Sequence, residues 1–312
     1  MTDLAAYLHS RAGTDLATAI IELAGAAARI SGEIRAPRHV LDAVAGELNA
    51  DGDTQKALDV LADEIILEAA RQAGAAAYMS EEREAAIPLA ENGPFIITSD
   101  PLDGSSNIGV NVSIGTIFSV LPTEGDGLVD GRAQLAAGFF VYGPQTTLLV
   151  TVGAGVESFR MDADGDFQLI DDNVRIPEQT GEFAINAGNQ RYWLPPVQRY
   201  VADCVAGADG RRGRNFSQRY VGSLVAEAWR IFCRGGVFLY PADTRDGFAD
   251  GRLRLVYEAA PMAFLAEQAG GRATDGTRDI LDITPTAVHQ RVPLVFGSVD
   301  EVEEVGRQHV AG

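Results

Sequence analysis

Apolar residues recur at helical spacing in two segments of the first quarter of the chain. Residues 14–34 repeat apolar side chains every three or four positions, behind Thr14 as a candidate N-cap. The apolar residues of this segment are Leu16, Ile20, Leu23, Ala27 and Ile30. Residues 55–73 show the same period and end near Gly74. We therefore predict two amphipathic helices here.

Short runs of β-branched and aromatic residues follow the second helix. The run 95–98 (FIIT) leads into the turn sequence DPLDG, which predicts a strand that ends in a loop. Five more runs predict strands at 113–121, 135–142, 146–152, 156–160 and 167–170. Turn sequences at Gly143-Pro144 and Asp164-Gly165 separate neighbouring runs, as in an antiparallel meander.

Strands and helices alternate after about residue 180. The predicted strands are 183–186, 237–240, 253–256 and 293–297, and the predicted helices are 193–206, 222–234, 260–269 and 299–310. Ser298 and Glu301 have the spacing of a capping box at the start of the last helix. We expect an α+β part in residues 1–180 and an α/β part in residues 181–312.

Charge and composition exclude several classes of protein. The chain has 44 Asp and Glu against 25 Lys and Arg, a net charge of −19, and no basic stretch that could follow a phosphate backbone. Nucleic acid is therefore not an expected partner. No apolar run of 18 residues occurs, and the first residues lack the pattern of a secretory signal. We expect no membrane partner and a cytoplasmic location.

The segment DPLDGSSN (100–107) carries the clearest chemistry. Asp100 and Asp103 lie three residues apart on a turn fixed by proline, and both can converge on a hard cation such as Mg²⁺. Gly104, Ser105 and Ser106 follow with accessible N–H groups and hydroxyls, which suit a phosphate. The alternative, from these residues alone, is a solvated acidic turn.

The chain resembles the class I fructose-1,6-bisphosphatases of the Mg²⁺-dependent sugar-phosphatase and inositol-monophosphatase superfamily. Seven stretches carry the resemblance and span nearly the whole chain: GDTQKALDV (52–60), SEE (80–82), DPLDGSSN (100–107), SIGTIF (113–118), RYVGSLVAE (219–227), GGVFLYPA (235–242) and LRLVYEAAPMAFLAEQAGG (253–271). The resemblance implies a layered α/β/α/β/α fold. Its N-terminal sheet is mixed and largely antiparallel, and its C-terminal half is α/β.

The resemblance also implies an acidic catalytic centre with two or more Mg²⁺ ions. The implied metal ligands are Glu81, Asp100, the carbonyl of Leu102, Asp103 and Glu258. Glu82 and Asp53 would take the proton of the attacking water, and Asp59 would orient nearby groups. Asp103, Gly104, Ser105 and Ser106 would hold the phosphate that is removed.

A second group of residues would bind the distal phosphate of the substrate. By resemblance these are Asn186, Tyr220, Tyr240, Arg252 and an Arg219 donated by a neighbouring subunit, which implies a homo-oligomer, and the family pattern is a tetramer. Two positions depart from the family: Arg252 replaces a common Lys, and Asn189 replaces a Tyr. The change at Asn189 removes one expected phosphate contact.

The resemblance implies Mg²⁺-dependent removal of the 1-phosphate of D-fructose 1,6-bisphosphate, in gluconeogenesis or the Calvin cycle. Sedoheptulose-1,7-bisphosphatase activity, alone or in addition, is the nearest alternative, because one more sugar carbon changes only the distance between the phosphates. An inositol-phosphate phosphatase is a broader alternative. A non-catalytic sugar-phosphate sensor is the alternative from another class, and it would be marked by the loss of metal carboxylates.

Overall fold

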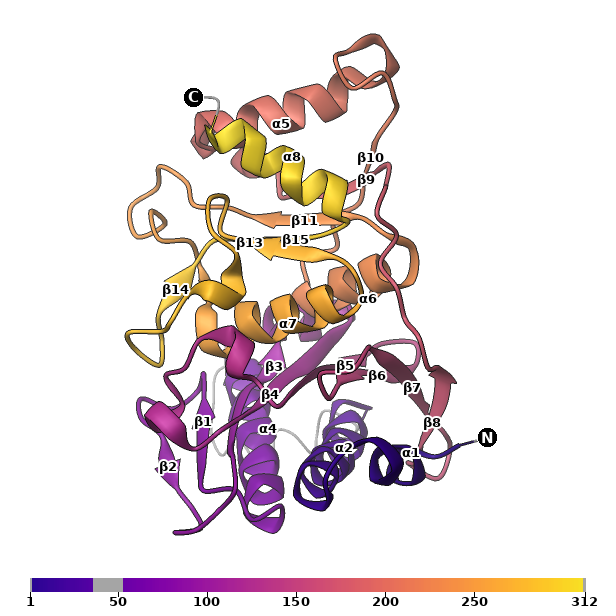
Figure 1. Ribbon diagram of the computed structural model, residues 1–312, viewed down its shortest axis with the longest axis vertical. Coiled ribbons are helices and arrows are strands. Elements are labelled where there is room, and N and C mark those ends of the chain that lie inside the picture. The colour runs from indigo at the N-terminus through magenta and orange to yellow at the C-terminus, as the bar shows by residue number, and fades with distance from the viewer. Residues whose placement is uncertain (1, 36–52, 311–312) are drawn as a thin grey trace. The chain divides into compact units, whose positions relative to one another are not determined.

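The computed structural model describes residues 2–35 and 53–310, without the side chains of residues 53–56 and 126. The chain divides into two compact units (Figure 1). The first unit comprises Met1–Gly127, Ala133–Asp172 and Ser223–Ala226. The second comprises Leu128–Arg132, Asn173–Gly222 and Glu227–Gly312.

Three helices of the first unit pack against its sheet. They are α1 (Leu4–Arg11), α2 (Thr14–Arg35) and α4 (Asp53–Gln72). The apolar stripe that predicts α2 is the buried side of this helix, with Ile20, Leu23 and Ile30 fully covered. Buried residues of these helices and of the strands form one apolar core. Packing of its apolar side against a sheet is the main source of stability for an amphipathic helix.

The sheet of the first unit has eight strands in the order β2-β1-β3-β4-β5-β6-β7-β8. The strands are β1 (Ala77–Ser80), β2 (Ile87–Pro88), β3 (Ile96–Asp103), β4 (Ile114–Leu121), β5 (Ala136–Tyr142), β6 (Thr146–Thr151), β7 (Glu157–Met161) and β8 (Phe167–Asp171). β1 and β3 are parallel, and every other pair is antiparallel. The predicted meander and the largely antiparallel sheet are confirmed.

β3 continues through DPLD, where the sequence predicted a loop. Its pairing with β4 shifts register between Asp100 and Asp103. Pro101 lies inside this irregularity, and proline has no N–H to donate to a neighbouring strand. The prediction that the strand ends at residue 98 is therefore wrong, because a bulge accommodates the proline and pairing resumes at Asp103.

The second unit has a five-stranded sheet in the order β10-β9-β11-β15-β13. The strands are β9 (Glu182–Ala184), β10 (Ser217–Gln218), β11 (Val237–Tyr240), β13 (Arg272–Thr274) and β15 (Leu294–Gly297), and β12 (Leu253–Arg254) pairs separately with β14 (Arg291–Val292). The helices are α5 (Pro195–Ala206), α6 (Leu224–Arg234), α7 (Ala260–Gln268) and α8 (Val299–Val310). Figure 1 shows α5 and α8 on one side of this sheet, and α6 and α7 on the other. The two units together supply the helix and sheet layers of the expected mixed α+β fold.

Short helical turns complete both units. The 3-10 turns are η1 (Ser105–Val110), η2 (Glu124–Gly127), η3 (Gly131–Ala133), η4 (Ala187–Tyr192), η5 (Gly207–Asp209) and η7 (Ile280–Asp282). The segment η6 (Leu255–Ala259) is a π-helix. The predicted strand 253–256 is therefore wrong beyond Arg254, because the apolar run LVY turns into η6 and buries its side chains there.

The capping box predicted at the start of α8 is also wrong. The hydroxyl of Ser298 accepts a hydrogen bond from the Gly236 N–H, 3.3 Å away. The Glu301 carboxylate is fully buried and accepts hydrogen bonds from Tyr200 and Arg212. Both side chains thus bind parts of the second unit that are distant in the sequence.

No helix in residues 2–35 and 53–310 is both long and apolar enough to cross a membrane.

Candidate active site

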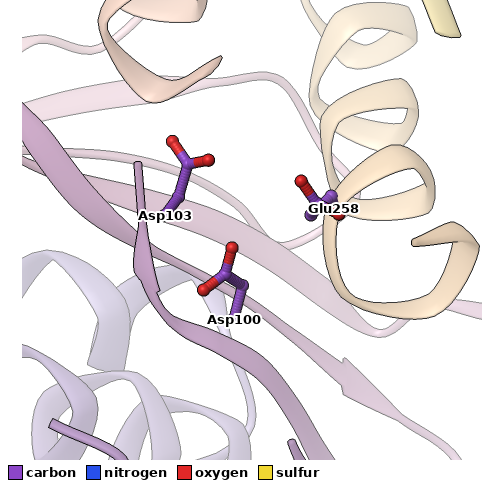
Figure 2. A group of neighbouring side chains, drawn as sticks. All are labelled: Asp100, Asp103 and Glu258. Atoms are coloured by element: carbon purple, nitrogen blue, oxygen red, sulfur yellow. The ribbon is translucent and has the colours of Figure 1, made fainter. Parts of the chain in front are cut away.

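The bulge in β3 carries two buried carboxylates. Figure 2 shows Asp100 and Asp103 projecting from this strand. Asp100 is 6 % exposed, and its Oδ1 accepts a hydrogen bond from the Leu102 N–H at 3.0 Å. Asp103 is 8 % exposed, and its Oδ2 accepts from the Val225 N–H at 3.0 Å. These backbone contacts fix the orientation of both carboxylates.

Burial raises the pKa of Asp103 to about 7. The nearby Glu81 carboxylate raises it further, while the backbone N–H groups of Val225 and Leu224 oppose the shift. A carboxylate surrounded in this way is stabilised in its charged form when a cation binds beside it.

The chain turns sharply directly after Asp103. Gly104 has φ of +76°, a conformation that side chains with a Cβ rarely adopt. Its position is also crowded, because a Cβ there would lie 3.3 Å from the Asn107 amide nitrogen. Ser105 and Ser106 begin η1 immediately afterwards, and Ser105 hydrogen-bonds the Asp59 side chain. The turn therefore brings Ser105 next to α4, with Ser106 directly after it.

Three further carboxylates predicted for catalysis lie close together in the first unit. Glu81 and Glu82 are the central residues of a turn closed by the hydrogen bond from the Arg83 N–H to the Ser80 carbonyl, at 3.2 Å. Burial, and then the charge of Glu82, raise the pKa of Asp59 to about 6. Asp59 Oδ1 is buried and has no hydrogen-bond partner among the described residues.

This set of oxygens fits a hard divalent cation. All the predicted ligand atoms are oxygens of carboxylates or of a backbone carbonyl, and Mg²⁺ prefers such oxygen ligands. Asp53, the remaining catalytic prediction, begins α4, but its side chain lies outside the described residues.

The residues predicted for the distal phosphate are in the second unit. Asn186 caps η4 through the Gly188 N–H at 3.0 Å, and its side chain also hydrogen-bonds Tyr220. Burial raises the pKa of Tyr220, and the neighbouring Tyr240 adds to the shift. Asn186 and Tyr240 line a small pocket that also contains Asn189. The structure thus brings together Asn186, Tyr220 and Tyr240.

The two arginines predicted for the same phosphate lie at the surface. Arg219 is half exposed, and its Nε lies 3.7 Å from Glu182 Oε1. Arg252 is exposed, and its guanidinium stacks on the Phe248 ring at 4.5 Å from the ring centre. Both side chains are held by a neighbour within their own unit while their charge still faces solvent.

Glu258 lies in the π-helix η6. It is 6 % exposed, and its Oε2 accepts a hydrogen bond from the Arg254 N–H at 2.6 Å. The strand predicted over 253–256 ends at Arg254, and η6 replaces its second half and carries Glu258. Glu258 is thus a buried carboxylate, as are Asp100 and Asp103 of the first unit (Figure 2).

Glu227 is a residue that the sequence prediction missed. It is fully buried in α6, accepts a hydrogen bond from the Val221 N–H, and pairs with Arg230 at 2.9 Å. It thereby fixes the backbone directly after Tyr220. The available signal was a lone acid on the apolar side of the predicted helix, between Val225 and Ile231.

The acidic centre on β3 and the turn at Gly104 fit a metal-dependent phosphatase, the class to which the matching family models also belong. Family models of fructose-1,6-bisphosphatase match nearly all of the chain, with the N-terminal domain at residues 6–172 and the C-terminal domain at residues 176–309. The chain belongs to the fructose-1,6-bisphosphatase family, and it is a phosphoric monoester hydrolase.

Curated relatives and a solved structure agree with this assignment. A class 1 fructose-1,6-bisphosphatase of Azorhizobium caulinodans is 54 % identical, over 83 % of this chain and 82 % of the relative. One of Rhodopseudomonas palustris is 49 % identical over 98 % and 92 %. The crystal structure of Leishmania major fructose-1,6-bisphosphatase in holo form has a TM-score of 0.89, with 32 % identity and 99 % of both chains covered.

Proposed function

We propose that the protein hydrolyses the 1-phosphate of D-fructose 1,6-bisphosphate to give fructose 6-phosphate and phosphate. The observation that best supports this function is the buried pair Asp100 and Asp103 on β3, which the tight turn at Gly104 follows directly. The class 1 relatives described above are named for this substrate. They give no support to the sedoheptulose-bisphosphatase alternative, and the retained carboxylates argue against a non-catalytic sensor.

The divalent metal requirement of the family is assigned here to Mg²⁺, with two or more ions. The proposed ligands are Glu81, Asp100, the Leu102 carbonyl, Asp103 and Glu258. Bound Mg²⁺ supplies a nucleophilic water of lowered pKa and neutralises the charge on the phosphate. The buried positions of Asp100, Asp103 and Glu258 support this ligand set.

The remaining carboxylates handle the proton and the phosphate. We assign removal of the proton from the attacking water to Glu82 and Asp53, and orientation of the neighbouring groups to Asp59. The hydrogen bond between Asp59 and Ser105 supports this role, since it links α4 to the serine turn. Gly104, Ser105 and Ser106 hold the phosphate, with Asp103 beside them.

The second unit binds the distal phosphate in this proposal. Asn186, Tyr220 and Tyr240 lie together and offer one amide and two hydroxyl groups. Arg252 adds a guanidinium, and Arg219 serves the site of a neighbouring subunit. Arginine suits both positions because its planar donor fork binds phosphate bidentately. This arrangement requires a homo-oligomer, which we propose to be a tetramer.

The wider assignments follow from the same proposal. Residues 1–180 form the metal-site domain, and residues 181–312 form the domain that binds the distal phosphate. The protein acts in the cytoplasm, in gluconeogenesis or the Calvin cycle. Neither nucleic acid nor a membrane is a partner.

Phosphate release from fructose 1,6-bisphosphate and sedoheptulose 1,7-bisphosphate, measured side by side, tests the proposed function. We expect Mg²⁺-dependent release from the fructose substrate, loss of release on chelation, and faster turnover of fructose than of sedoheptulose bisphosphate. myo-Inositol 1-phosphate is the matched monoester control and should be a poor substrate. Absence of Mg²⁺-dependent release from either bisphosphate would refute the proposal.

A further inference from the structure

We propose that Arg83 is a positioning residue that sets the spacing between the Glu81–Glu82 turn and Asp59 on α4. The inference rests on the proposed function, because it concerns the metal and catalytic carboxylates of that site. Arg83 does not touch the substrate in this proposal. It acts through the backbone of the turn and through two acidic residues of α4, Asp63 and Glu64.

Backbone hydrogen bonds anchor the first residue of the turn to β3 and close the turn on itself. The Glu81 N–H donates to the Ser99 carbonyl of β3 at 3.1 Å, and the Arg83 N–H donates to the Ser80 carbonyl at 3.2 Å. The hydroxyl of Ser80 also accepts from the Glu82 N–H at 3.2 Å. These bonds fix the turn to the sheet and leave its distance from α4 to be set by a side chain.

Arg83 supplies that side-chain connection. Its Nε donates to Asp63 Oδ2 at 2.5 Å, and its Nη2 donates to Glu64 Oε1 at 2.5 Å. Asp63 lies four residues after Asp59, so both are on the same side of α4. The Arg83–Asp63 bond therefore ties the last residue of the turn to a point one helical turn from Asp59.

Asp63 is itself rigidly held. It is 3 % exposed, and its Oδ1 accepts from the Tyr78 hydroxyl at 3.0 Å. The same hydroxyl lies 2.8 Å from the Ser99 hydroxyl on β3. The hydrogen-bonded chain Arg83–Asp63–Tyr78–Ser99 thus connects the turn, α4, β1 and β3, and it is buried from Asp63 onward. Buried networks of this kind keep a single geometry when every member is satisfied.

The site needs such a connection because its carboxylates repel one another. Glu81 and Glu82 both act on Asp59 by like-charge repulsion. Without a restraint, the turn would move away from α4 before a cation binds, and binding would have to reverse that movement. A restraint that holds the metal ligands in their binding geometry before the cation arrives increases metal affinity. Residues that hydrogen-bond to metal ligands generally have this effect.

Direct Mn²⁺ binding to the full-length, substrate-free protein, measured by electron paramagnetic resonance, tests the inference. Mn²⁺ takes the same oxygen ligands as Mg²⁺. We expect Arg83→Gln to weaken Mn²⁺ binding by about 10-fold or more, and Arg83→Lys by less, because it keeps the charge but not the fork. Activation of the enzyme by Mg²⁺ should shift to higher concentration by a similar factor. The KM for the sugar bisphosphate at saturating Mg²⁺ should change by less than about 2-fold.

Arg71→Gln is the matched control. Arg71 pairs with Glu68 on the exposed side of α4, so its removal should leave Mn²⁺ affinity unchanged. Asp63→Asn is the second variant, and its effect on Mn²⁺ affinity should not add to that of Arg83→Gln, because both break one connection. Each assay is run well below the unfolding temperature of the variant.

Unchanged Mn²⁺ affinity in folded Arg83→Gln, with only a lower unfolding temperature, would overturn the inference and leave Arg83 a purely structural residue. Fully additive effects of Arg83→Gln and Asp63→Asn would also overturn it. Failure of the proposed function would show separately, as a wild-type protein that binds Mn²⁺ but releases no phosphate from the bisphosphates.

Discussion

Asp103 is a carboxylate that the fold buries almost completely and orients through the Val225 N–H. We expect Asp103→Asn to reduce phosphate release by at least about 100-fold, because the amide removes a ligand charge from the metal site. The shape and the backbone contact are retained, so circular dichroism and the unfolding temperature in chelator should stay close to those of the wild type. Near wild-type turnover in this variant would contradict the assignment of Asp103 as a ligand.

The pKa values of Asp103 and Asp59 predict how pH changes the stability of the metal-free protein. Both are raised in the folded state, from 3.8 to about 7 and about 6. The folded state therefore binds more protons than the unfolded state in this range, and the free energy of unfolding falls as pH rises from about 4 to 7. Mg²⁺ needs the charged carboxylates, so stabilisation by Mg²⁺ grows as pH rises.

Thermal unfolding in chelator and in excess Mg²⁺, from about pH 5 to 8, measures this effect. The difference between the two unfolding temperatures should increase with pH and level off above about pH 7. Asp103→Asn is the control. It removes the carboxylate with the higher pKa of the two, and the dependence of the unfolding temperature on pH should become weaker. A constant difference across the range would rule out these carboxylates as the titrating ligands.

At the scale of elements, α8 shows how one buried acid organises a whole segment. Glu301 lies in the first turn of the helix and accepts hydrogen bonds from Tyr200 Oη at 2.8 Å and Arg212 Nη2 at 2.6 Å. Arg214 binds the same carboxylate. These ion pairs hold the loop that contains Arg212 and Arg214 against α8.

Glu301→Gln should lower the free energy of unfolding by about 3 kcal/mol, because it leaves the mostly buried Arg212 without its charged partner. Glu303→Gln is the matched control on the same helix. Glu303 is 43 % exposed and pairs with Arg272 at 3.3 Å, so its loss should change stability by less than about 0.5 kcal/mol. Denaturant unfolding compares the two variants, and equal effects would show that the Glu301 cluster adds no stability.

At the scale of the whole molecule, the proposed donation of Arg219 makes activity depend on assembly. Arg219→Ala should raise the KM for the sugar bisphosphate by about 10-fold or more, since a charge-assisted phosphate contact contributes about 1.5–3 kcal/mol. Mixed oligomers of Arg219→Ala and Asp103→Asn subunits show whether Arg219 serves the site of a neighbouring subunit or the site of its own subunit.

In a mixed oligomer, an Arg219→Ala subunit has an intact metal site and can receive Arg219 from its Asp103→Asn neighbour. We expect a fraction of the active sites to recover wild-type KM after subunits are mixed and reassembled. Analytical ultracentrifugation should report a tetramer, and co-purification of an untagged variant with an affinity-tagged one verifies that subunits have mixed. No recovery in verified mixed oligomers would mean that Arg219 serves its own subunit.

Local patterns predicted the elements well where periodicity and packing agree. α2, α5, α6 and α7 begin and end within two residues of the predicted ranges. In α2, α5 and α6 the apolar stripe is also the buried side, whereas α7 is apolar and buried on all sides over residues 260–266. The prediction failed at β3 and η6, where a strand passes through proline and an apolar run becomes a π-helix. Both outcomes depend on neighbouring strands and on burial, which sequence periodicity does not record.

The sequence by itself determined the family, most elements and the acidic motif with its two aspartates, because these depend on residue type and spacing along the chain. The tertiary structure decided which acids are buried and what orients them. Asp103 meets Val225, Glu301 meets Arg212, and Arg83 meets Asp63. These partners lie between 20 and 122 residues apart in sequence. Only folding brings them within hydrogen-bonding distance, and burial there strengthens the electrostatic interactions of the charged groups.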